Sequence, residues 1–289
     1  MPGLKEIRKR IVSVKSTKQI TKAMKMVSAV KFRKAQGRIL ELRPYADKMN
    51  SILSSLSQSV ERGHPLLELR PRKTVEVVVF TSDRGLCGAF NTNIIKAALK
   101  QIKDIKEEGI NISISTIGKK GTDLIKRRGF PLRASWTGLS GRITYSNAQE
   151  IAKDIIEGYT NEAFDEVIII YNEFKSALVQ KVTVRRLLPI TTITTEEPSQ
   201  DVTTDFLYEP SKQEIFNTLL PKNIEVQVFR ALLDSWASEE AARMTAMENA
   251  TKAADDMIAS LTLQYNKARQ ASITKELMDI VGGVEALKQ

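Results

Sequence analysis

Residues 222–281, KNIEVQVFRALLDSWASEEAARMTAMENATKAADDMIASLTLQYNKARQASITKELMDIV, decide the fold. These sixty residues contain no glycine or proline and are rich in Ala, Met, Leu, Glu, Arg and Lys, most of which favour a helix. At about 1.5 Å per residue the helix would be roughly 90 Å long, which is more than a globular core requires. Pro221 is expected at its start and Gly282-Gly283 at its end.

Small side chains recur along one face of this predicted helix, which indicates that a second helix packs closely against it. The series is Ala242, Ala246, Ala250, Ala253, Met257, Leu261, Gln264, Ala268 and Ala271. The acidic pairs Glu239-Glu240 and Asp255-Asp256 lie on the same helix. Neighbours in sequence point in different directions, so both pairs are interpreted as part of the solvated face.

The N-terminal segment is the expected partner helix. Its apolar stripe begins with four residues three or four apart and resumes, after a slip at residues 16–18, with four more: Leu4, Ile7, Ile11, Val14, Ile20, Met24, Val27 and Val30. The slip predicts a loosely wound coil rather than strict heptads. Pro44 is expected to kink or end the helix, which then resumes until Gly63.

Charge is concentrated in the same N-terminal segment. Residues 1–38 hold twelve Lys or Arg and one acidic residue, Glu6, whereas the whole chain has a net charge of +10. Residues 222–289 hold eight basic and ten acidic residues, so the two terminal helices could pair with complementary charge. The basic run itself is either a solvated helix face or a surface for an acidic partner.

The middle of the chain alternates strand and helix. The pattern predicts strands at 74–80, 112–117, 166–171 and 178–184, and helices at 91–108, 122–128 and 146–159, the last with a capping box of Ser146 and Gln149. This alternation is typical of a mostly parallel sheet, in which the last two strands could pair as a hairpin. The expected fold is therefore α/β plus a long antiparallel coiled coil, with a Rossmann-like domain (74–190) inserted between helices at 1–62 and 211–289, the second preceded by a linker at 191–210.

Residues 81–91, TSDRGLCGAFN, form the most suggestive local motif, because they follow a strand and open a helix as phosphate-binding loops do. The motif lacks both the GxGxxG spacing and the Gly-Lys-Ser/Thr of a P-loop. A tight turn is the favoured interpretation, with Gly85 and Gly88 giving backbone freedom and Asp83 bonding local amides. Cys87 is interpreted as a small buried residue rather than as a reactive thiol.

No residue pattern predicts catalysis, a cofactor or a metal site. The chain has one cysteine and one histidine, His64, which excludes an internal disulfide and a zinc site of the usual Cys/His kind. The lone cysteine favours a reducing compartment, and no apolar run is long enough to span a membrane. A nucleotide-binding enzyme that uses the 81–91 loop is one alternative. A basic nucleic-acid-binding coil is another, although Phe32 is the only aromatic residue before Tyr45.

Three long motifs, in order, carry a resemblance to a known family. Residues 20–29, ITKAMKMVSA, continuing to 31–36, KFRKAQ, closely resemble the N-terminal signature of F-type ATP synthase gamma subunits. Residues 82–91, SDRGLCGAFN, are similar to the family's central motif. The C-terminal likeness comprises SEEAARMTAM at 238–247, YNKARQASITKEL at 265–277 and IVGG at 280–283.

The resemblance implies a central-stalk rotor subunit of the F1 sector, with no catalytic site of its own. In that family the terminal helices form a coil inside a ring of three alpha and three beta subunits, and the α/β domain touches epsilon and the membrane c-ring of Fo. Proton flow turns the ring, and the coil drives the beta subunits through their catalytic states. The subunit also regulates ATPase activity and proton flow.

The resemblance also assigns contact residues by position. Lys22, Met24 and Lys25 match positions near acidic loops of the beta subunits, and Arg269 and Gln270 match residues that hydrogen-bond a beta-subunit loop. The lone Cys87 differs from chloroplast-type relatives, which carry a regulatory cysteine pair, and no transit-like extension is present. A peripheral protein on the cytoplasmic face of a bacterial plasma (inner) membrane is therefore expected.

Overall fold

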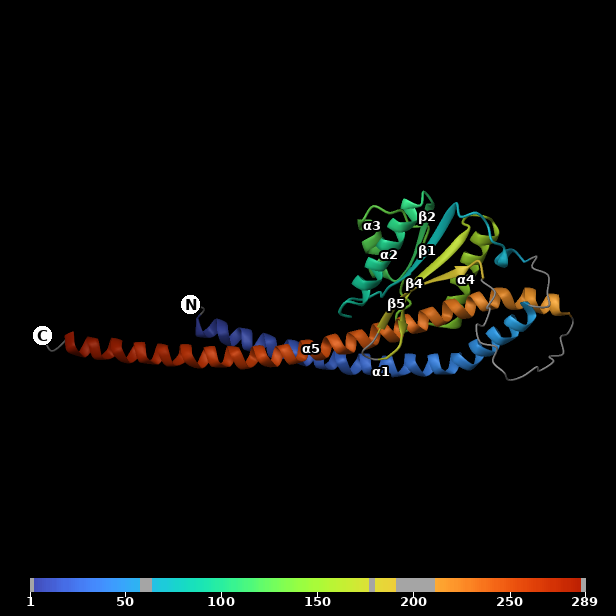
Figure 1. Cartoon of the computed structure of the whole chain (residues 1–289). Coiled ribbons are helices and arrows are strands. Elements are labelled where there is room, and N and C mark those ends of the chain that lie inside the picture. The colour runs from blue at the N-terminus through green and yellow to red at the C-terminus, as the bar shows by residue number, and fades with distance from the viewer. Residues whose placement is uncertain (1–2, 58–63, 177–179, 191–210, 287–289) are drawn as a thin grey trace. The chain divides into compact units, whose positions relative to one another are not determined.

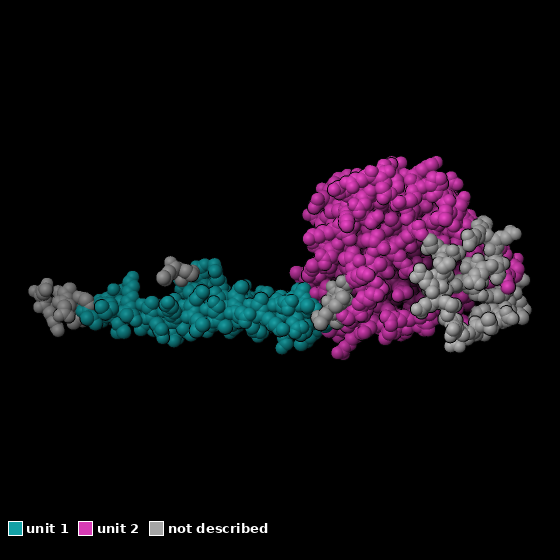
Figure 2. Space-filling model, viewed as in Figure 1, with its two compact units in different colours: residues 1–28, 244–289 teal, residues 29–243 magenta. Residues whose placement is uncertain are grey.

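A computed structural model describes residues 3–57, 64–176, 180–190 and 211–286 (Figure 1). The chain forms two compact units, residues 1–28 with 244–289 (the helix-pair unit) and residues 29–243 (the sheet unit), as Figure 2 shows. The elements are α1 (Leu4–Ser57), η1 (Pro65–Leu67), β1 (Thr74–Phe80), α2 (Phe90–Glu107), β2 (Asn111–Ile117), α3 (Lys119–Arg127), β3 (Ala134–Trp136), α4 (Tyr145–Thr160), β4 (Glu166–Phe174), β5 (Gln180–Leu188) and α5 (Lys212–Ala286).

The sheet has the strand order β3-β2-β1-β4-β5. β3, β2, β1 and β4 run parallel, whereas β5 is antiparallel to β4, so the predicted parallel sheet with a final hairpin is confirmed. β3 was not predicted because three residues are too few to show a periodicity. The predicted linker at 191–210 lies outside the described residues, as do positions 178–179 of the predicted last strand and 58–62 of the predicted first helix.

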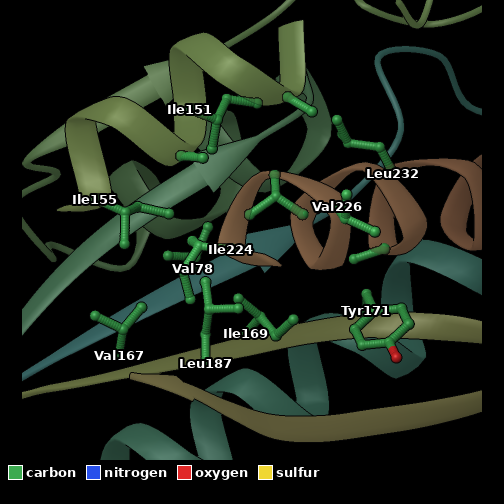
Figure 3. Close-up of a cluster of buried hydrophobic side chains, with 14 of the residues drawn as sticks. Val78, Ile151, Ile155, Val167, Ile169, Tyr171, Leu187, Ile224, Val226 and Leu232 are labelled. Carbon is green, nitrogen blue, oxygen red and sulfur yellow. The ribbon is translucent and has the colours of Figure 1, made fainter. Parts of the chain in front are cut away.

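Helices cover both faces of the sheet, which is why β1 is a nearly continuous run of buried valines. Val75, Val77 and Val79 pack with α2 on one face. On the other face Val78 packs with α4 and with the part of α5 in this unit, represented in Figure 3 by Ile151 and Ile224. The inserted domain therefore shares one core with the segments of the terminal helices that belong to the sheet unit.

Several predicted helix boundaries are wrong. α5 begins at Lys212, close to the predicted bound of 211, but Pro221 lies inside the helix rather than at its start, and α1 likewise continues through Pro44. Pro221 costs α5 one backbone hydrogen bond, but the buried side chains Phe216, Leu220 and Ile224 on either side of it pack into the core and offset that loss. The capping box of α4 is formed by Thr144 and Asn147, two residues earlier than the predicted Ser146 and Gln149.

No helix in the described part of the chain has an apolar stretch long enough to cross a bilayer. The helices listed above instead bury their apolar side chains against one another or against the sheet.

Substitution of two glycines tests how tightly the residue that follows β1, Thr81, packs against the start of α3. Gly118 has φ +92, and a Cβ there would lie 2.1 Å from the carbonyl oxygen of Thr81; Gly129 has φ +80 with nothing within 4 Å. We expect Gly129→Ala to cost about 1–2 kcal/mol from backbone strain alone. Gly118→Ala should cost roughly 3 kcal/mol more, because the backbone must move. Urea unfolding followed by circular dichroism measures both, and equal costs would contradict the observed packing.

Candidate functional site

In the helix-pair unit, α1 and α5 run antiparallel in one register. Thr21 Oγ1 and Thr251 Oγ1 lie 2.8 Å apart in a hydrogen bond. Lys18 Nζ lies 2.5 Å from Asp255 Oδ1, and Lys25 Nζ lies 3.2 Å from Glu248 Oε1. The residue numbers of each of these pairs add up to 272 or 273, so the three contacts define a single register.

The contact stripe of α1 is a strict heptad, contrary to the predicted slip. Apart from Met24, the less exposed positions up to residue 28 are three and four residues apart in alternation: Leu4, Ile7, Ile11, Val14, Lys18, Thr21, Lys25 and Ser28. Polar side chains continue the stripe because Lys18 and Lys25 pair with acidic residues of α5 and Thr21 with a hydroxyl. Ile20 and Val27, which were predicted to resume the stripe, are instead 57% and 55% exposed.

The contact face of α5 is rotated from the predicted one. From residue 251 onward its less exposed positions are Thr251, Ala254, Ile258, Leu261, Tyr265, Ala268 and Ser272, and nearly all of residues 244–250 are less exposed as well. Ala246, Ala250, Leu261 and Ala268 of the predicted series lie among these positions, whereas Ala253, Met257, Gln264 and Ala271 are exposed. Small residues occur all round this helix, so their spacing did not determine which face is buried.

α5 extends beyond the N-terminus of α1. In the observed register Leu4 is level with Ala268, so among the described residues no part of α1 lies beside residues 269–286. Large apolar side chains are exposed along this single-helix segment: Ile273, Leu277, Met278, Ile280 and Val281. Such a run of exposed apolar residues is typical of a surface that another protein covers.

The predicted partner contacts differ in how accessible they are. Lys22, Arg269 and Gln270 are exposed, and Met24 is half-buried. Lys25 is half-buried and ion-paired with Glu248, so in this chain it already has a partner. The exposed apolar residues Ile20 and Val27 on the outer face of α1 were not predicted as contacts. The strict heptad, once known, identifies them, because it places both off the contact stripe.

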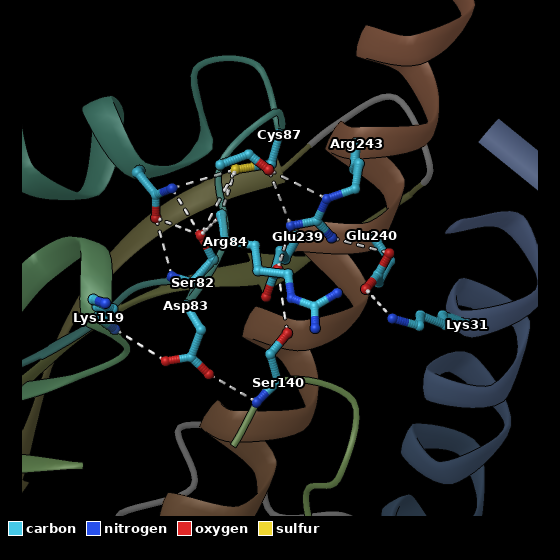
Figure 4. Close-up of polar contacts among 12 residues, drawn as sticks. Lys31, Ser82, Asp83, Arg84, Cys87, Lys119, Ser140, Glu239, Glu240 and Arg243 are labelled. Carbon is cyan, nitrogen blue, oxygen red and sulfur yellow. Dashed lines mark hydrogen bonds and ion pairs between the residues drawn. The ribbon is translucent and has the colours of Figure 1, made fainter. Parts of the chain in front are cut away.

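In the sheet unit, Asp83 joins three loops. Its carboxylate accepts hydrogen bonds of 3.0 Å from the backbone amides of Lys119, Gly138 and Ser140. Figure 4 shows those from Lys119 and Ser140. These amides are far from Asp83 in sequence, so the expectation of local amides is wrong. The bonds hold the 81–91 loop against the start of α3 and the loop that follows β3.

The backbone of the 81–91 loop takes a positive φ at Leu86 (64°) and Gly88 (57°). Gly85 is not among the residues of positive φ, and a Cβ there would meet only Lys120 Cε at 3.9 Å. Cys87 is buried beside Ser82 and Asn91. Burial raises the pKa of the Cys87 thiol, which makes it less reactive.

Glu239 and Glu240 of α5 are buried, so their assignment to the solvated face is wrong. Arg243 lies 2.5 Å from Glu239 Oε1 and 3.0 Å from Glu240 Oε2, and it donates to the carbonyl oxygen of Gly85 (Figure 4). Lys31 of α1 lies 3.8 Å from Glu240. Burial raises the pKa of Glu239, and Arg243 opposes that rise. The i+3 and i+4 spacing of Arg243 from both acids was the sequence signal for this cluster.

The carboxyl edge of the parallel strands, where doubly wound folds bind ligands, is filled by α5. Trp236 and Glu239 line a hollow there of only about 30 Å³, together with residues at the ends of β1 and β2. That volume admits a water molecule or two but no nucleotide. The geometry therefore gives no support to the alternative of a nucleotide-binding enzyme.

Comparison with known proteins identifies the family. The sequence model described as ATP synthase matches residues 3–287. The ATP synthase gamma chains of Trichlorobacter lovleyi and Geobacter metallireducens are 48% and 49% identical to this chain, over the full length of each protein. The chain belongs to the ATP synthase gamma-chain family.

Solved structures have the same fold. A chain of the central stalk/c-ring structure of Tetrahymena thermophila mitochondrial ATP synthase has a TM-score of 0.59 and 29% identity, and the match covers 80% of this chain and 99% of that one. A chain of the Euglena gracilis mitochondrial enzyme has a TM-score of 0.68 at 22% identity, covering 98% and 94%. The fold expected of a gamma chain, paired terminal helices with an inserted Rossmann-like domain, is confirmed.

The register of this gamma chain can be tested by disulfide formation. In a Cys87→Ser background, Thr21→Cys with Thr251→Cys should form a disulfide readily, because the two hydroxyls are 2.8 Å apart. Thr21→Cys with Ala253→Cys is the matched control, since Ala253 belongs to the predicted face but is exposed. Non-reducing gels measure both; preferential cross-linking of the control pair would overturn the register.

The buried cluster predicts a pH-dependent loss of stability. Arg243→Met leaves two buried carboxylates without their main partner, which should cost about 3–5 kcal/mol at pH 8. The deficit should shrink as the pH falls towards 5, because protonation of Glu239 removes the unpaired charge. Lys31→Met removes a half-exposed contact and should cost less than about 1 kcal/mol. Urea unfolding at both pH values measures this, and a pH-independent deficit would contradict the account.

Proposed function

We propose that this gamma chain is the central-stalk rotor subunit of the F1 sector and couples rotation of the membrane c-ring to conformational cycling of catalytic beta subunits. The observation that carries the proposal is the helix-pair unit, in which two helices share one register and expose apolar side chains outward, and in which α5 continues alone with further exposed apolar side chains. Central stalk and c-ring are named for the Tetrahymena thermophila relative.

Fixed register suits the transmission of torque. Ion pairs and a hydroxyl pair lie between the two helices along the seam, so sliding one helix past the other would break several contacts together. The outward residues Ile20 and Val27 offer no hydrogen bonds to a surrounding protein. An apolar surface of this kind can turn inside a ring of alpha and beta subunits without specific bonds to break at each step.

The sheet unit is suited to receive the turning force. Arg243, Glu239 and Glu240 hold α5 against the 81–91 loop, while Lys31 extends the cluster to α1. A force applied to the α/β domain would therefore reach both helices of this unit. In the proposed assembly this domain contacts epsilon and the c-ring, and ATP chemistry takes place in the beta subunits. The chain would be a peripheral protein on the cytoplasmic face of the bacterial plasma membrane, without catalytic residues or cofactor of its own.

Reconstitution tests the proposal directly. Alpha and beta subunits assembled with this chain should hydrolyse ATP continuously, whereas the same subunits without it should lose most of that activity. Equal hydrolysis with and without the chain would refute the rotor function.

A substitution on the outer face of α1 tests whether this apolar surface turns against the ring of alpha and beta subunits. Val27→Asp should slow ATP hydrolysis by the reconstituted complex roughly fivefold, equivalent to about 1 kcal/mol, because a charge would have to be desolvated against the ring. Leu69→Asp is the matched control, since Leu69 is also an exposed apolar residue but lies outside the helix pair. Both variants should melt like the parent chain. Equal activity of the two variants would contradict the proposal that Val27 faces the ring during rotation.

A further inference from the structure

A second hollow in the sheet unit has no part in the proposed rotor function. It is open to solvent on one side and has a volume of about 270 Å³ between α1, the end of β4 and α5. Its lining is mainly charged: Ile39, Arg43, Asp47, Glu173, Phe174, Lys175, Arg230 and Asp234. The volume is close to the lower end of the range for small-molecule sites, which begins at about 300 Å³.

One pair of charges in this hollow is satisfied internally. Lys175 Nζ donates to Glu173 Oε1 at 2.8 Å, and Thr183 Oγ1 lies 3.4 Å from the other oxygen of Glu173. The pKa of Glu173 is lowered chiefly by the hydrogen bond from Lys175, so this carboxylate is stable as an ion. The other charged residues of the hollow are Arg43, Arg230, Asp47 and Asp234.

Asp234 is the most buried of these four residues. Its side chain is only 5% exposed, and its Oδ2 accepts no hydrogen bond among the described residues. The nearest cationic atom, Arg230 Nε, lies 3.8 Å away, which is beyond hydrogen-bond distance. Burial raises the pKa of Asp234 to about 6, so near neutral pH the site holds a buried carboxylate whose Oδ2 has no hydrogen-bond donor among the described residues.

Arg43 and Asp47 face the same hollow from α1, one turn apart. Within the described part of the chain neither makes an ion pair shorter than 4.0 Å, and Arg230 makes none besides its long contact with Asp234. Two guanidinium groups from different helices are well suited to grip a phosphate or a carboxylate. The carboxylates of Asp234 and Asp47 are correspondingly suited to an ammonium group.

We propose that this hollow binds a small zwitterion, with its phosphate or carboxylate held by Arg43 and Arg230 and its ammonium group held by Asp234 and Asp47. A ligand with both charges accounts for the balance of cations and anions around the hollow. A pure anion would be repelled by the two aspartates, and a pure cation by the two arginines. The same chemistry occurs in a free amino-alkyl phosphate and in an ethanolamine phospholipid headgroup.

Calorimetric titration of the isolated full chain at pH 7.5 tests the ligand class. The probes are O-phosphoethanolamine, inorganic phosphate and ethylammonium, at matched ionic strength. O-phosphoethanolamine should bind at least about tenfold more tightly than either single-charge probe, because it alone pairs with both halves of the site. Phosphate binding as tightly as O-phosphoethanolamine, or no binding of O-phosphoethanolamine up to millimolar concentration, would overturn the proposal.

Variants assign the two halves of the site. Arg43→Gln with Arg230→Gln should abolish the affinity for O-phosphoethanolamine, and Asp234→Asn should reduce it to that of phosphate. Arg33→Gln is the matched control, since Arg33 is an exposed arginine on α1 outside the hollow. Equal loss in the control would show that net charge alone attracts the ligand and would overturn the site. Circular dichroism establishes that each variant is folded.

Vesicles distinguish a free ligand from a lipid headgroup. If the hollow takes the headgroup, the chain should sediment with phosphatidylethanolamine vesicles more than with phosphatidylcholine vesicles, and the Asp234→Asn variant should lose that preference. If it takes the free zwitterion, only the soluble probe should bind in an Asp234-dependent manner. These measurements use the isolated chain, so their outcome is independent of whether the reconstituted complex depends on the gamma chain for ATP hydrolysis.

Discussion

The antiparallel contact between α1 and α5 is the constraint on which the remaining structure depends. Three polar contacts, at Lys18, Thr21 and Lys25, set one register in the helix-pair unit. That register decides which apolar residues are enclosed and which, such as Ile20 and Val27, are turned outward. It also leaves residues 269–286 of α5 without α1 beside them in the described structure. The polar residues on the seam cost some hydrophobic contact but make the register specific, because a slipped pairing would leave their charges unmatched.

In the sheet unit, the same two helices form part of the core of the α/β domain. Val78 and the neighbouring strands bury one face against α4 and α5, and Trp236 and Glu239 occupy the edge where related topologies bind ligands. In other doubly wound folds this edge of the sheet binds ligands, whereas here α5 fills it. The buried cluster of Arg243 with Glu239 and Glu240 joins that helix to the 81–91 loop, so the loop's role is to anchor α5.

The sequence predicts the elements of this fold better than their contacts. A sixty-residue stretch without glycine or proline establishes α5, and the alternation of strand and helix establishes the sheet. Pro221 was wrongly placed at the start of the long helix, because packing around it outweighs its local helix-breaking effect. The contact face was misassigned at Ala253, Met257, Gln264 and Ala271 because small residues surround α5 on several sides, whereas the observed stripe includes Thr251 and Tyr265. Glu239 and Glu240 were placed in solvent because burial of a charge is decided by a partner, here Arg243, and by tertiary packing that periodicity does not reveal.

Direct observation of rotation is the measurement that bears most on the central claim. In the reconstituted complex with immobilised alpha and beta subunits, a probe attached through Lys96→Cys on the exposed face of α2 would report the motion of the chain, while the native Cys87 is buried and should remain unlabelled. The account predicts continuous rotation of the probe in one direction while ATP is hydrolysed. A probe that stays fixed relative to the beta subunits during sustained hydrolysis would contradict it.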